Sequence, residues 1–329
     1  MSNTVLLTGA TGLLGNAIAR LLVEQGRSVR ALVRDTAKAA GVVPSACELV
    51  VGDVTDQSSV ARAAEGCDVV YHASGLPEQW LADPTLFDRV NVEGTRHVVE
   101  AALANGVSKF VYVSTIDVFR FPAPRETFDE SEIDPKPKDT AYECSKQKAD
   151  RLVVEALDKG LPAVFLHPSG IYGPGPLTSP GTNHLITDLV HGRVPMLLPG
   201  AIPVVYSDDV ARGHLLAEKN APIGARYILS ESTHSLTSIA RSVRAATNGR
   251  AKIPPILPLA VASLVATVGE YVSSWTGSPP LLPSGQLHFL QYGANPSSAK
   301  AIRELGWAPR SFTQGLEQTL AFLTERGRI

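Results

Sequence analysis

TGATGLLG, residues 8–15, follows a short run of aliphatic residues and opens a segment with helical periodicity. Gly9, Gly12 and Gly15 stand where a tight turn, a close backbone approach and helix packing each exclude a side chain. The amino end of such a helix favours an anion such as a pyrophosphate. The stretch therefore predicts a strand, a turn and a helix that bind a dinucleotide. The alternative is that the glycines serve the turn alone.

The first half of the chain alternates short strand-like runs with helical segments. This alternation predicts the α/β class, with a Rossmann-type doubly wound parallel sheet and a smaller C-terminal α/β substrate domain. We expect residues 1–168 to form the NAD(P)-binding domain. Residues 169–329 should form mainly the substrate-binding domain, with some segments returning to the first. The expected strands are 4–8, 29–33, 48–52, 69–72, 110–114 and 163–166. The expected helices are 13–25, 58–64, 87–105 and 142–159.

The composition is that of a globular protein with a large core, since 44% of the 329 residues are hydrophobic and 19% are charged. A formal net charge of -2 provides no broad basic surface, so nucleic acid is not expected as a partner. Three cysteines, Cys47, Cys67 and Cys144, have no metal-type spacing and favour a reducing compartment. The amino terminus lacks the features of a secretory signal, and we expect a cytoplasmic protein.

One apolar segment tests that expectation. Residues 253–269 carry no charge, but they contain Pro254, Pro255 and Pro258 and are shorter than the roughly 20 residues of a spanning helix. We therefore expect no stable membrane span, and we favour a buried or pocket-lining helix. Interfacial contact with a membrane is the alternative.

The residues after the second predicted strand bear on the choice of cofactor. NAD sites usually carry an acid there for the ribose 2'-hydroxyl, whereas this chain has Arg34. The guanidinium can pair with a 2'-phosphate, which favours NADP(H), and Arg30 on the same strand could assist. Asp35 is the competing feature, because it could bind the ribose of NAD(H) instead.

Tyr142 and Lys146 lie four residues apart on a predicted helix, so both side chains share one face. A neighbouring ammonium favours the phenolate and should lower the pKa of the tyrosine, making it a usable proton donor and acceptor. Tyr142 could then protonate the alkoxide that forms when hydride from a nicotinamide reaches a carbonyl. A solvated helix face would carry the same spacing without any function.

Several further motifs occur in order: VVGDVTD around Asp53, VVYHASG, NVEGT around Asn91, YECSK, and HPSGIYGPG, in which His167 replaces an arginine. Together with TGATGLLG and the closing KAIRELGWAPR, they resemble the extended branch of the short-chain dehydrogenase/reductase superfamily over nearly the whole chain. The resemblance is to its NAD-dependent epimerase/dehydratase-like members. NVEGT is also compatible with an ordinary amphipathic helix, and His167 with a satisfied strand-end histidine.

The resemblance implies the roles of further residues. It makes Thr115 the third catalytic residue beside Tyr142 and Lys146, and leaves the adjacent Ser114 for a strand-end hydrogen bond. Lys146 would also bind the nicotinamide ribose. With the reasoning above, the cofactor-binding residues are Gly9, Thr11, Gly12, Leu13, Leu14, Gly15, Arg34, Asp53, Val54, Ala73, Ser74, Tyr142, Lys146 and Pro168.

The expected substrate class follows from positions at which this chain differs from the dehydratases and epimerases of the superfamily. Dehydratases of the superfamily resemble the form STDEVYG, whereas Ile116 here cannot protonate a leaving hydroxyl. Asp117 keeps one carboxylate, which could equally be a structural acid at the strand end. Ile202 and Pro203 stand where sugar-nucleotide epimerases usually place an arginine for the diphosphate. We expect the proline-rich residues 120–137 to form a loop across the mouth of the site. The predicted pocket is apolar, lined by Trp80, Phe119, Ile171 and Met196.

STIDV, VRALVRD and the late apolar segment look most like the 3β-hydroxysteroid dehydrogenase and dihydroflavonol 4-reductase group. The resemblance therefore implies an NADP(H)-dependent oxidoreductase that interconverts a ketone and an alcohol on a hydrophobic small molecule, of steroid, flavonoid or alkyl type. One alternative is a sugar epimerase with tightly bound NAD, and another is a non-catalytic NADP(H)-sensing protein. The scattered histidines have no ligand spacing, so no metal is expected. By analogy, helices 87–105 and 142–159 could form a homodimer.

Overall fold

Seven parallel strands form the main sheet of the computed structural model, which describes residues 4–78, 80–124, 126–176, 182–280 and 282–329. The strand order confirms the predicted doubly wound topology, because the chain reverses direction across the sheet between β1 and β4. The carboxyl ends of all seven strands therefore meet along one edge. In spatial order the strands are β10 (Arg226–Leu229), β7 (Ala163–Pro168), β5 (Lys109–Val113), β4 (Val69–His72), β1 (Thr4–Thr8), β2 (Ser28–Val33) and β3 (Glu48–Val51).

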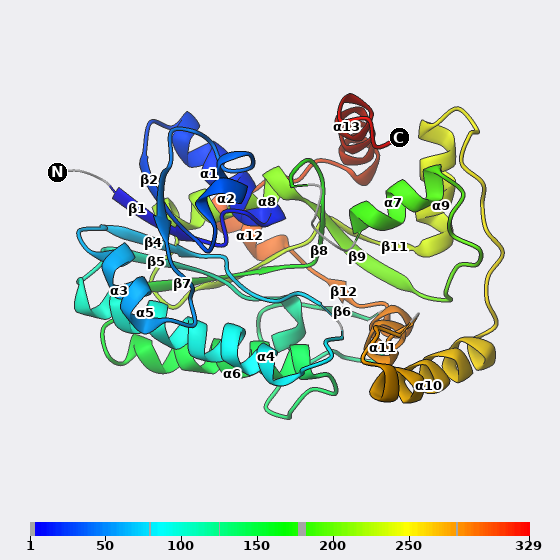
Figure 1. Cartoon of the computed structure of the whole chain (residues 1–329), viewed down its shortest axis with the longest axis horizontal. Coiled ribbons are helices and arrows are strands. Elements are labelled where there is room, and N and C mark those ends of the chain that lie inside the picture. Colours follow the sequence, from blue (N-terminus) through cyan, green and yellow to red (C-terminus); the bar gives the residue numbers. More distant parts are fainter. Residues whose placement is uncertain (1–3, 79, 125, 177–181, 281) are drawn as a thin grey trace.

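Helices cover both faces of this sheet (Figure 1). Alternation along β1 explains the two cores, since Val5 and Leu7 pack in one cluster and Leu6 in the other. The first face carries α1 (Leu13–Glu24), α8 (Ser207–Asn220) and α12 (Ala299–Leu305). The second carries α3 (Gln57–Ala64), α5 (Gly94–Ala104) and α6 (Ala141–Leu157). Strand β10 and helix α8 both come from beyond residue 169, so segments from the second half of the chain complete the sheet and its cover.

The single helix expected over residues 87–105 is wrong in detail. The chain forms a short α4 (Thr85–Phe87), a π-helical segment η1 (Asp88–Glu93) and then α5. A π-helical turn is wider than an α-helical one and is common at functional sites. Here the π-helical segment contains the buried Asn91, whose side chain bonds to backbone groups of another loop. Helical periodicity alone does not distinguish these two kinds of turn.

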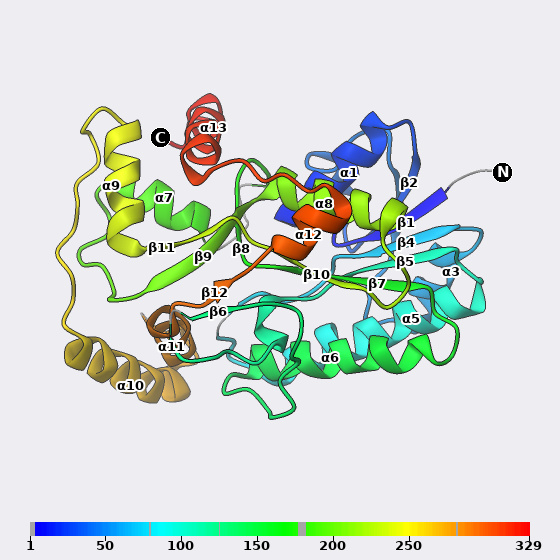
Figure 2. The ribbon, with the colours of Figure 1, turned by 180° about the vertical axis from the view of Figure 1, so that it is seen from behind.

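A second lobe stands beside the carboxyl edge of the sheet (Figure 2). Its three-stranded sheet contains β8 (Gly170–Tyr172), β9 (Ala201–Tyr206) and β11 (Ser232–Ser235). Side chains from its helices share one apolar cluster with this sheet; these helices are α7 (Thr182–Val190), α9 (Leu236–Ala246) and α13 (Phe312–Glu325). A two-stranded ladder joins β6 (Thr127–Phe128) to β12 (Asn295–Pro296).

The apolar segment near the end of the chain departs from expectation. It forms α10 (Leu259–Thr276), which is followed by α11 (Ser284–Tyr292). We expected a buried or pocket-lining helix, but α10 exposes most of its large apolar side chains. Prolines up to Pro258 delay the start of the helix, because proline disfavours helical backbone in the residue before it. Among the described residues, no helix has both the length and the apolar character that crossing a bilayer requires.

Candidate active site

The glycine-rich turn connects β1 to α1 and has no room for side chains. Gly9 has a φ of +77°, and a Cβ atom there would lie 2.5 Å from the carbonyl oxygen of Ala73. A Cβ on Gly15 would lie only 2.1 Å from the carbonyl oxygen of Gly9. Gly12 is the N-cap of α1 and has no side chain to occupy the first amides of the helix. These amides are therefore available to an anion, as a pyrophosphate site requires.

The predicted residues after β4 lie against this turn. The Ser74 amide donates to the Thr8 hydroxyl at 3.2 Å, and that hydroxyl lies 2.8 Å from Nδ1 of the buried His72. His72 Nε2 contacts the Thr95 hydroxyl at 2.9 Å, and Thr95 donates onward to the carbonyl oxygen of Asn91 at 2.6 Å. Burial lowers the pKa of His72 to about 3, so the ring is neutral. This chain of bonds fixes the turn relative to β4 and η1.

The residues after β2 separate the two predicted cofactor preferences. Arg34 is exposed, and within the described ranges its side chain makes no hydrogen bond or ion pair. Asp35 is the N-cap of α2 (Thr36–Ala40), and its carboxylate accepts from the Lys38 amide at 3.1 Å. The assisting role expected for Arg30 is wrong in this structure, because its guanidinium binds the Glu48 carboxylate at 2.9 Å. Arg34 is thus the available cation at this position.

The other predicted cofactor residues lie along the same edge. The Asp53 carboxylate accepts from both the amide and the hydroxyl of Thr55, each at 2.9 Å. The side chain of Val54 is buried and packs against Gly94, and its carbonyl oxygen lies 2.8 Å from Nδ1 of His97. Thr11 is exposed, Leu13 half-buried and Leu14 buried at the start of α1, and Pro168 is the last residue of β7.

Tyr142 and Lys146 both lie in the first half of α6, which a capping box between Thr140 and Glu143 begins. The Lys146 ammonium donates to the carbonyl oxygen of Val113 at 3.0 Å. Burial lowers the pKa of Lys146 to about 8, although the nearby carboxylates oppose this shift. The lysine is thus directed toward the end of β5.

The pKa of Tyr142 is not lowered as the sequence suggested. Burial raises it well above the ordinary value, and the negative charge of Asp117 adds to the rise. A hydrogen bond with the Thr115 hydroxyl opposes these two effects. Before ligands bind, Tyr142 is therefore a protonated phenol, the form that can donate a proton to an alkoxide.

Thr115 and Ser114, at the end of β5, have different partners. Ser114 donates to the buried Asp150 carboxylate at 2.8 Å. Thr115 precedes the short 3₁₀ helix η2 (Ile116–Val118) and donates to the Asp117 carboxylate at 2.7 Å. Its hydroxyl also hydrogen-bonds to Tyr142, and the charge of Asp117 acts on both Tyr142 and Lys146. The three residues expected for catalysis, Thr115, Tyr142 and Lys146, thus surround Asp117.

Asp117 is a buried carboxyl group beside these residues. Its Oδ1 atom has no hydrogen-bond partner among the described residues. Burial and the Glu143 charge raise the pKa of Asp117 to about 6, against the opposing hydrogen bond from Thr115. The sequence marked Asp117 as one retained carboxylate without assigning it a role, and its burial next to Thr115 makes it part of the site.

Replacing Asp117 by asparagine should stabilise the fold at neutral pH. The carboxyl has a higher pKa in the folded than in the unfolded chain. Its ionisation therefore lowers the free energy of unfolding, and this loss grows as the pH rises from the unfolded-state pKa to the folded-state pKa. A shift of about two pKa units corresponds to roughly 1–3 kcal/mol. We expect the gain in Asp117→Asn to be largest near about pH 7.5 and about half as large near about pH 5. Urea unfolding at the two pH values measures it, and an equal difference at both would contradict the raised pKa.

A buried charge cluster behind the catalytic residues was not predicted. Asp150, one helical turn after Lys146, is bound by two nitrogens of Arg226 at 3.1 and 2.7 Å. Arg226 also donates to His167 Nε2 at 3.2 Å, and His167 Nδ1 donates to the carbonyl oxygen of Thr115 at 3.1 Å. Burial lowers the pKa of His167 to about 3, so it is the satisfied neutral histidine that the sequence allowed. Only the four-residue spacing of Lys146 and Asp150 could have indicated this cluster.

Asn91 is a second residue whose role the sequence left open. Its side chain accepts from the Leu76 amide at 2.8 Å and donates to the Ser145 hydroxyl at 2.9 Å. Ser145 donates in turn to the carbonyl oxygen of Tyr142 at 2.7 Å. Asn91 therefore ties the loop after β4 to the helix that carries the catalytic pair. The NVEGT motif was the only signal for it.

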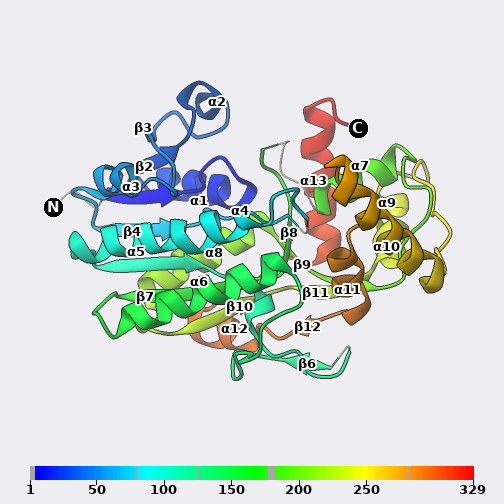
Figure 3. The same ribbon diagram turned by 60° about the horizontal axis from the view of Figure 1, so that its bottom comes forward.

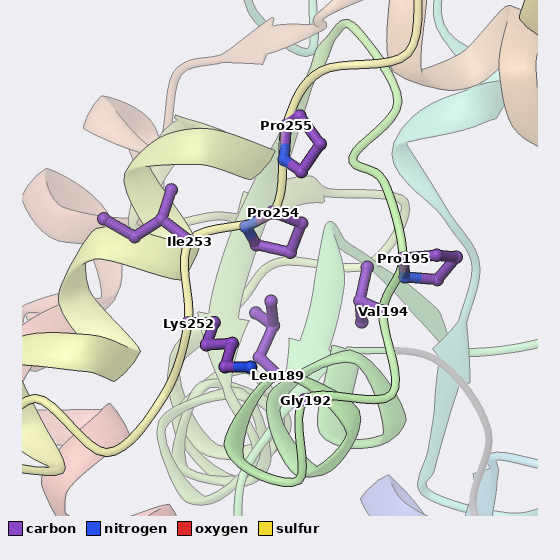
Figure 4. Close-up of a pocket in the computed structure, with 8 residues that line it drawn as sticks. All are labelled: Leu189, Gly192, Val194, Pro195, Lys252, Ile253, Pro254 and Pro255. Atoms are coloured by element: carbon purple, nitrogen blue, oxygen red, sulfur yellow. The ribbon is translucent and has the colours of Figure 1, made fainter.

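The four expected pocket residues occupy four different segments. Phe119 is a core residue instead of a pocket residue, because it is fully buried with its ring 4.6 Å from that of His167. Trp80 and Ile171 are half-buried on the loop after β4 and on β8. Met196 is exposed. Its neighbour Pro195, but not Met196 itself, lines a pocket of about 260 Å³ between the end of α7 and residues 252–255 (Figure 4). This pocket belongs to the second lobe.

Comparison with known proteins places the chain among nicotinamide-dependent enzymes. The sequence model of the NAD dependent epimerase/dehydratase family matches residues 5–229. Sterol demethylase protein B of Methylococcus capsulatus is 29% identical over 99% of this chain and 100% of its own length. A putative dihydroflavonol 4-reductase of Synechocystis sp. is 28% identical over 100% of this chain and 97% of its own. The crystal structure of gox2253 has a TM-score of 0.87 and 32% identity, with both chains fully covered.

Proposed function

Because this chain belongs to the NAD dependent epimerase/dehydratase family, we propose that it is an NADP(H)-dependent oxidoreductase interconverting a ketone and an alcohol on a hydrophobic small molecule. The observation that carries the proposal is the meeting of Tyr142, Lys146 and Thr115 at the carboxyl edge of the sheet, beside an open glycine-rich turn. The similarity to a protein named as a dihydroflavonol 4-reductase supports this choice of reaction.

The residues of the turn and of the strand ends fit a dinucleotide. The free amides at the start of α1 suit the pyrophosphate, and the exposed Arg34 suits a 2'-phosphate. Asp53 follows β3, where it suits the adenosine half of the dinucleotide, and Lys146 suits the ribose next to the nicotinamide. When bound, the nicotinamide supplies or accepts the hydride.

The proton comes from Tyr142. In the direction of ketone reduction, its phenol donates to the oxygen of the substrate as negative charge develops there. The Lys146 ammonium, one helical turn further along α6, would favour the phenolate that this leaves. The Thr115 hydroxyl hydrogen-bonds to the phenol oxygen of Tyr142. Asp150 and Arg226 hold the surrounding helix and strands, and His167 holds the backbone of Thr115.

The residues at one position of β9 support a hydrophobic substrate and not a sugar nucleotide. Ile202 and Pro203 lie in β9, where a diphosphate-binding arginine would be expected in an epimerase. We also propose a cytoplasmic location, because Cys47, Cys67 and Cys144 are all free thiols. A homodimer through α5 and α6 is part of the same proposal, and the exposed Val154 on α6 would lie in that contact.

Turnover tests the proposed reaction. Purified protein is mixed with NADPH and a panel of cyclic and long-chain ketones, and the loss of reduced-nicotinamide absorbance is followed. We expect stoichiometric oxidation of NADPH with at least one ketone of the panel. Interconversion of UDP-sugars without net change in the cofactor would refute the proposal and identify an epimerase.

Replacing Arg34 by alanine should reduce the preference for NADPH. A charge-assisted hydrogen bond contributes about 1.5–3 kcal/mol, so NADPH affinity should fall roughly 10- to 100-fold while NADH affinity changes little. Isothermal titration of both cofactors measures the two values. Lys38→Ala is the matched control, because Lys38 is a neighbouring exposed cation that also contacts Asp35. Equal losses for NADPH and NADH in Arg34→Ala would contradict the role of Arg34.

A further inference from the structure

Helix α10 buries its small side chains and exposes its large apolar ones, which is the opposite of the usual arrangement. The buried side chains of α10 are small, namely Ala262, Ala266 and Ser273, and Val265 packs beside them half-buried. The large ones face outward: Leu264 is 63% exposed, Val268 51% and Trp275 79%. Positions 264, 268, 271 and 275 follow one another at helical spacing and so form one stripe. A helix of a globular protein normally turns such a stripe toward the core.

This helix stands at the edge of the molecule. It packs on α11 through a small cluster that includes Leu282 and Leu287. In all three ribbon views α10 lies at the end of the molecule opposite the amino terminus, and Figure 3 shows it on the outer side of the second lobe. Its outward stripe is therefore an exposed apolar ridge.

The segment that leads to this ridge is basic. Residues 232–269 contain no aspartate or glutamate, whereas the chain as a whole has a formal net charge of -2. The exposed basic residues of this stretch lie on α9 and on the connector to α10; they are Arg241, Arg244, Arg250 and Lys252. The connector and both helices occupy the same end of the molecule (Figures 1 and 2). The end of the molecule that carries the apolar ridge is thus also basic.

Two aromatic side chains lie at the carboxyl-terminal end of the stripe. The rings of Tyr271 and Trp275 lie 6.0 Å apart near the carboxyl end of α10. Tryptophan and tyrosine are favoured at the boundary between lipid headgroups and acyl chains, and basic residues are attracted to anionic headgroups. The stripe itself carries no charge, and the one carboxylate of α10, Glu270, accepts a hydrogen bond from the Ser284 amide at the start of α11. An apolar ridge with these neighbours matches a lipid surface in both polarity and charge.

We propose that α10 docks this protein on the surface of an anionic phospholipid bilayer, with Leu264, Val268 and Trp275 inserted among the lipids and the basic residues of α9 and the connector over the headgroups. The helix lies in the plane of the interface and does not span the bilayer. Its attachment through α11 leaves the main sheet and the active site outside the lipid.

The docked helix would also place the active-site loop near the membrane. Tyr292, at the end of α11, lies with its ring 5.1 Å from that of Phe121 and donates a hydrogen bond to the carbonyl oxygen of Pro122. These two residues follow η2 and the catalytic Thr115 by a few positions. A hydrophobic substrate could then pass from the lipid to the site. This step rests on the proposed function, whereas the docking does not.

Vesicle co-sedimentation of the full chain tests the docking. Vesicles of phosphatidylcholine alone are compared with vesicles that also contain phosphatidylglycerol, at low and high salt. We expect the anionic vesicles to bind at least about fivefold more protein at low salt, and salt to weaken that binding. Val268→Glu should reduce binding at least about tenfold, because a charge would enter the apolar layer. Ile302→Glu on α12, where Ile302 is 52% exposed, is the matched control and should bind as the wild type does.

Two further readouts make the result decisive. Insertion should shift the fluorescence of Trp275 to shorter wavelength, and Trp275→Phe should remove that shift. Light scattering without lipid gives the oligomeric state, and NADPH titration checks that every variant is folded. The proposal is overturned if the wild type binds no vesicles, if it binds both vesicle types equally, or if both glutamate variants lose binding alike. It is also overturned if Val268→Glu only converts a dimer to a monomer, since α10 would then contact a second copy of the chain.

Discussion

Replacing Tyr142 by phenylalanine should lower kcat by about 10²- to 10⁴-fold, the usual contribution of a positioned proton donor. The variant keeps the ring, which lies 6.3 Å from that of Phe87, and loses only the hydroxyl. Without it, the oxygen of the substrate has no donor at the moment when hydride transfer places charge there. Steady-state turnover of NADPH with the accepted ketone measures the loss.

The loss of turnover can be assigned to proton transfer only if Tyr142→Phe still binds NADPH normally. NADPH affinity should change by no more than about threefold, since the phenol acts on the transition state more than on the bound cofactor. Tyr227→Phe is the control, because it removes a phenol hydroxyl that bonds to Glu304 away from the catalytic residues. Undiminished turnover in Tyr142→Phe would show that another group supplies the proton.

Replacing Arg226 by methionine should destabilise the fold by about 3–5 kcal/mol, as expected when one partner of a buried ion pair is removed. Burial alone would raise the pKa of Asp150, but the hydrogen bonds and charge of Arg226 hold it below its usual value. Without the guanidinium, an ionised carboxylate would remain buried with Ser114 as its partner. Urea unfolding near neutral pH measures the loss.

A second substitution separates this charge effect from lost packing. Asp150→Asn added to Arg226→Met removes the unpaired charge and should restore at least about half of the lost stability. The loss in Arg226→Met alone should shrink as pH falls, because the carboxyl can then be protonated in the folded chain. A loss that is independent of pH and unrelieved by Asp150→Asn would mean that Arg226 acts only through its packing on the Phe165 ring.

The parts of the fold that the sequence predicted well are those with a strong local pattern. The glycine spacing of the turn and the continuous apolar runs of β1, β4 and β5 leave few other conformations. Helix η1 was predicted as ordinary α-helix, because Asn91 acts through contacts with distant loops that periodicity does not contain. The exposure of α10 was missed for a related reason. An apolar composition indicates that a helix is buried, but it does not say against what.

The site shows the same difference between residues in local motifs and residues that act through distant contacts. Tyr142, Lys146 and the glycines belong to compact motifs, so spacing and resemblance located them. Arg226 lies far along the chain, on a strand that reaches the main sheet only through its topology. The direction of the Tyr142 pKa shift was also wrong, because burial and Asp117 act on the phenol in ways that its spacing from Lys146 does not reveal.

A titration of the purified protein with NADPH and NADH, after absorbance has shown whether it carries a cofactor, tests the central claim most directly. We predict cofactor-free protein that binds NADPH at least about tenfold more tightly than NADH, as a guanidinium paired with the 2'-phosphate requires. NAD that survives purification and exchanges with neither reduced cofactor would contradict the account. That result would instead indicate an epimerase with a permanently bound cofactor.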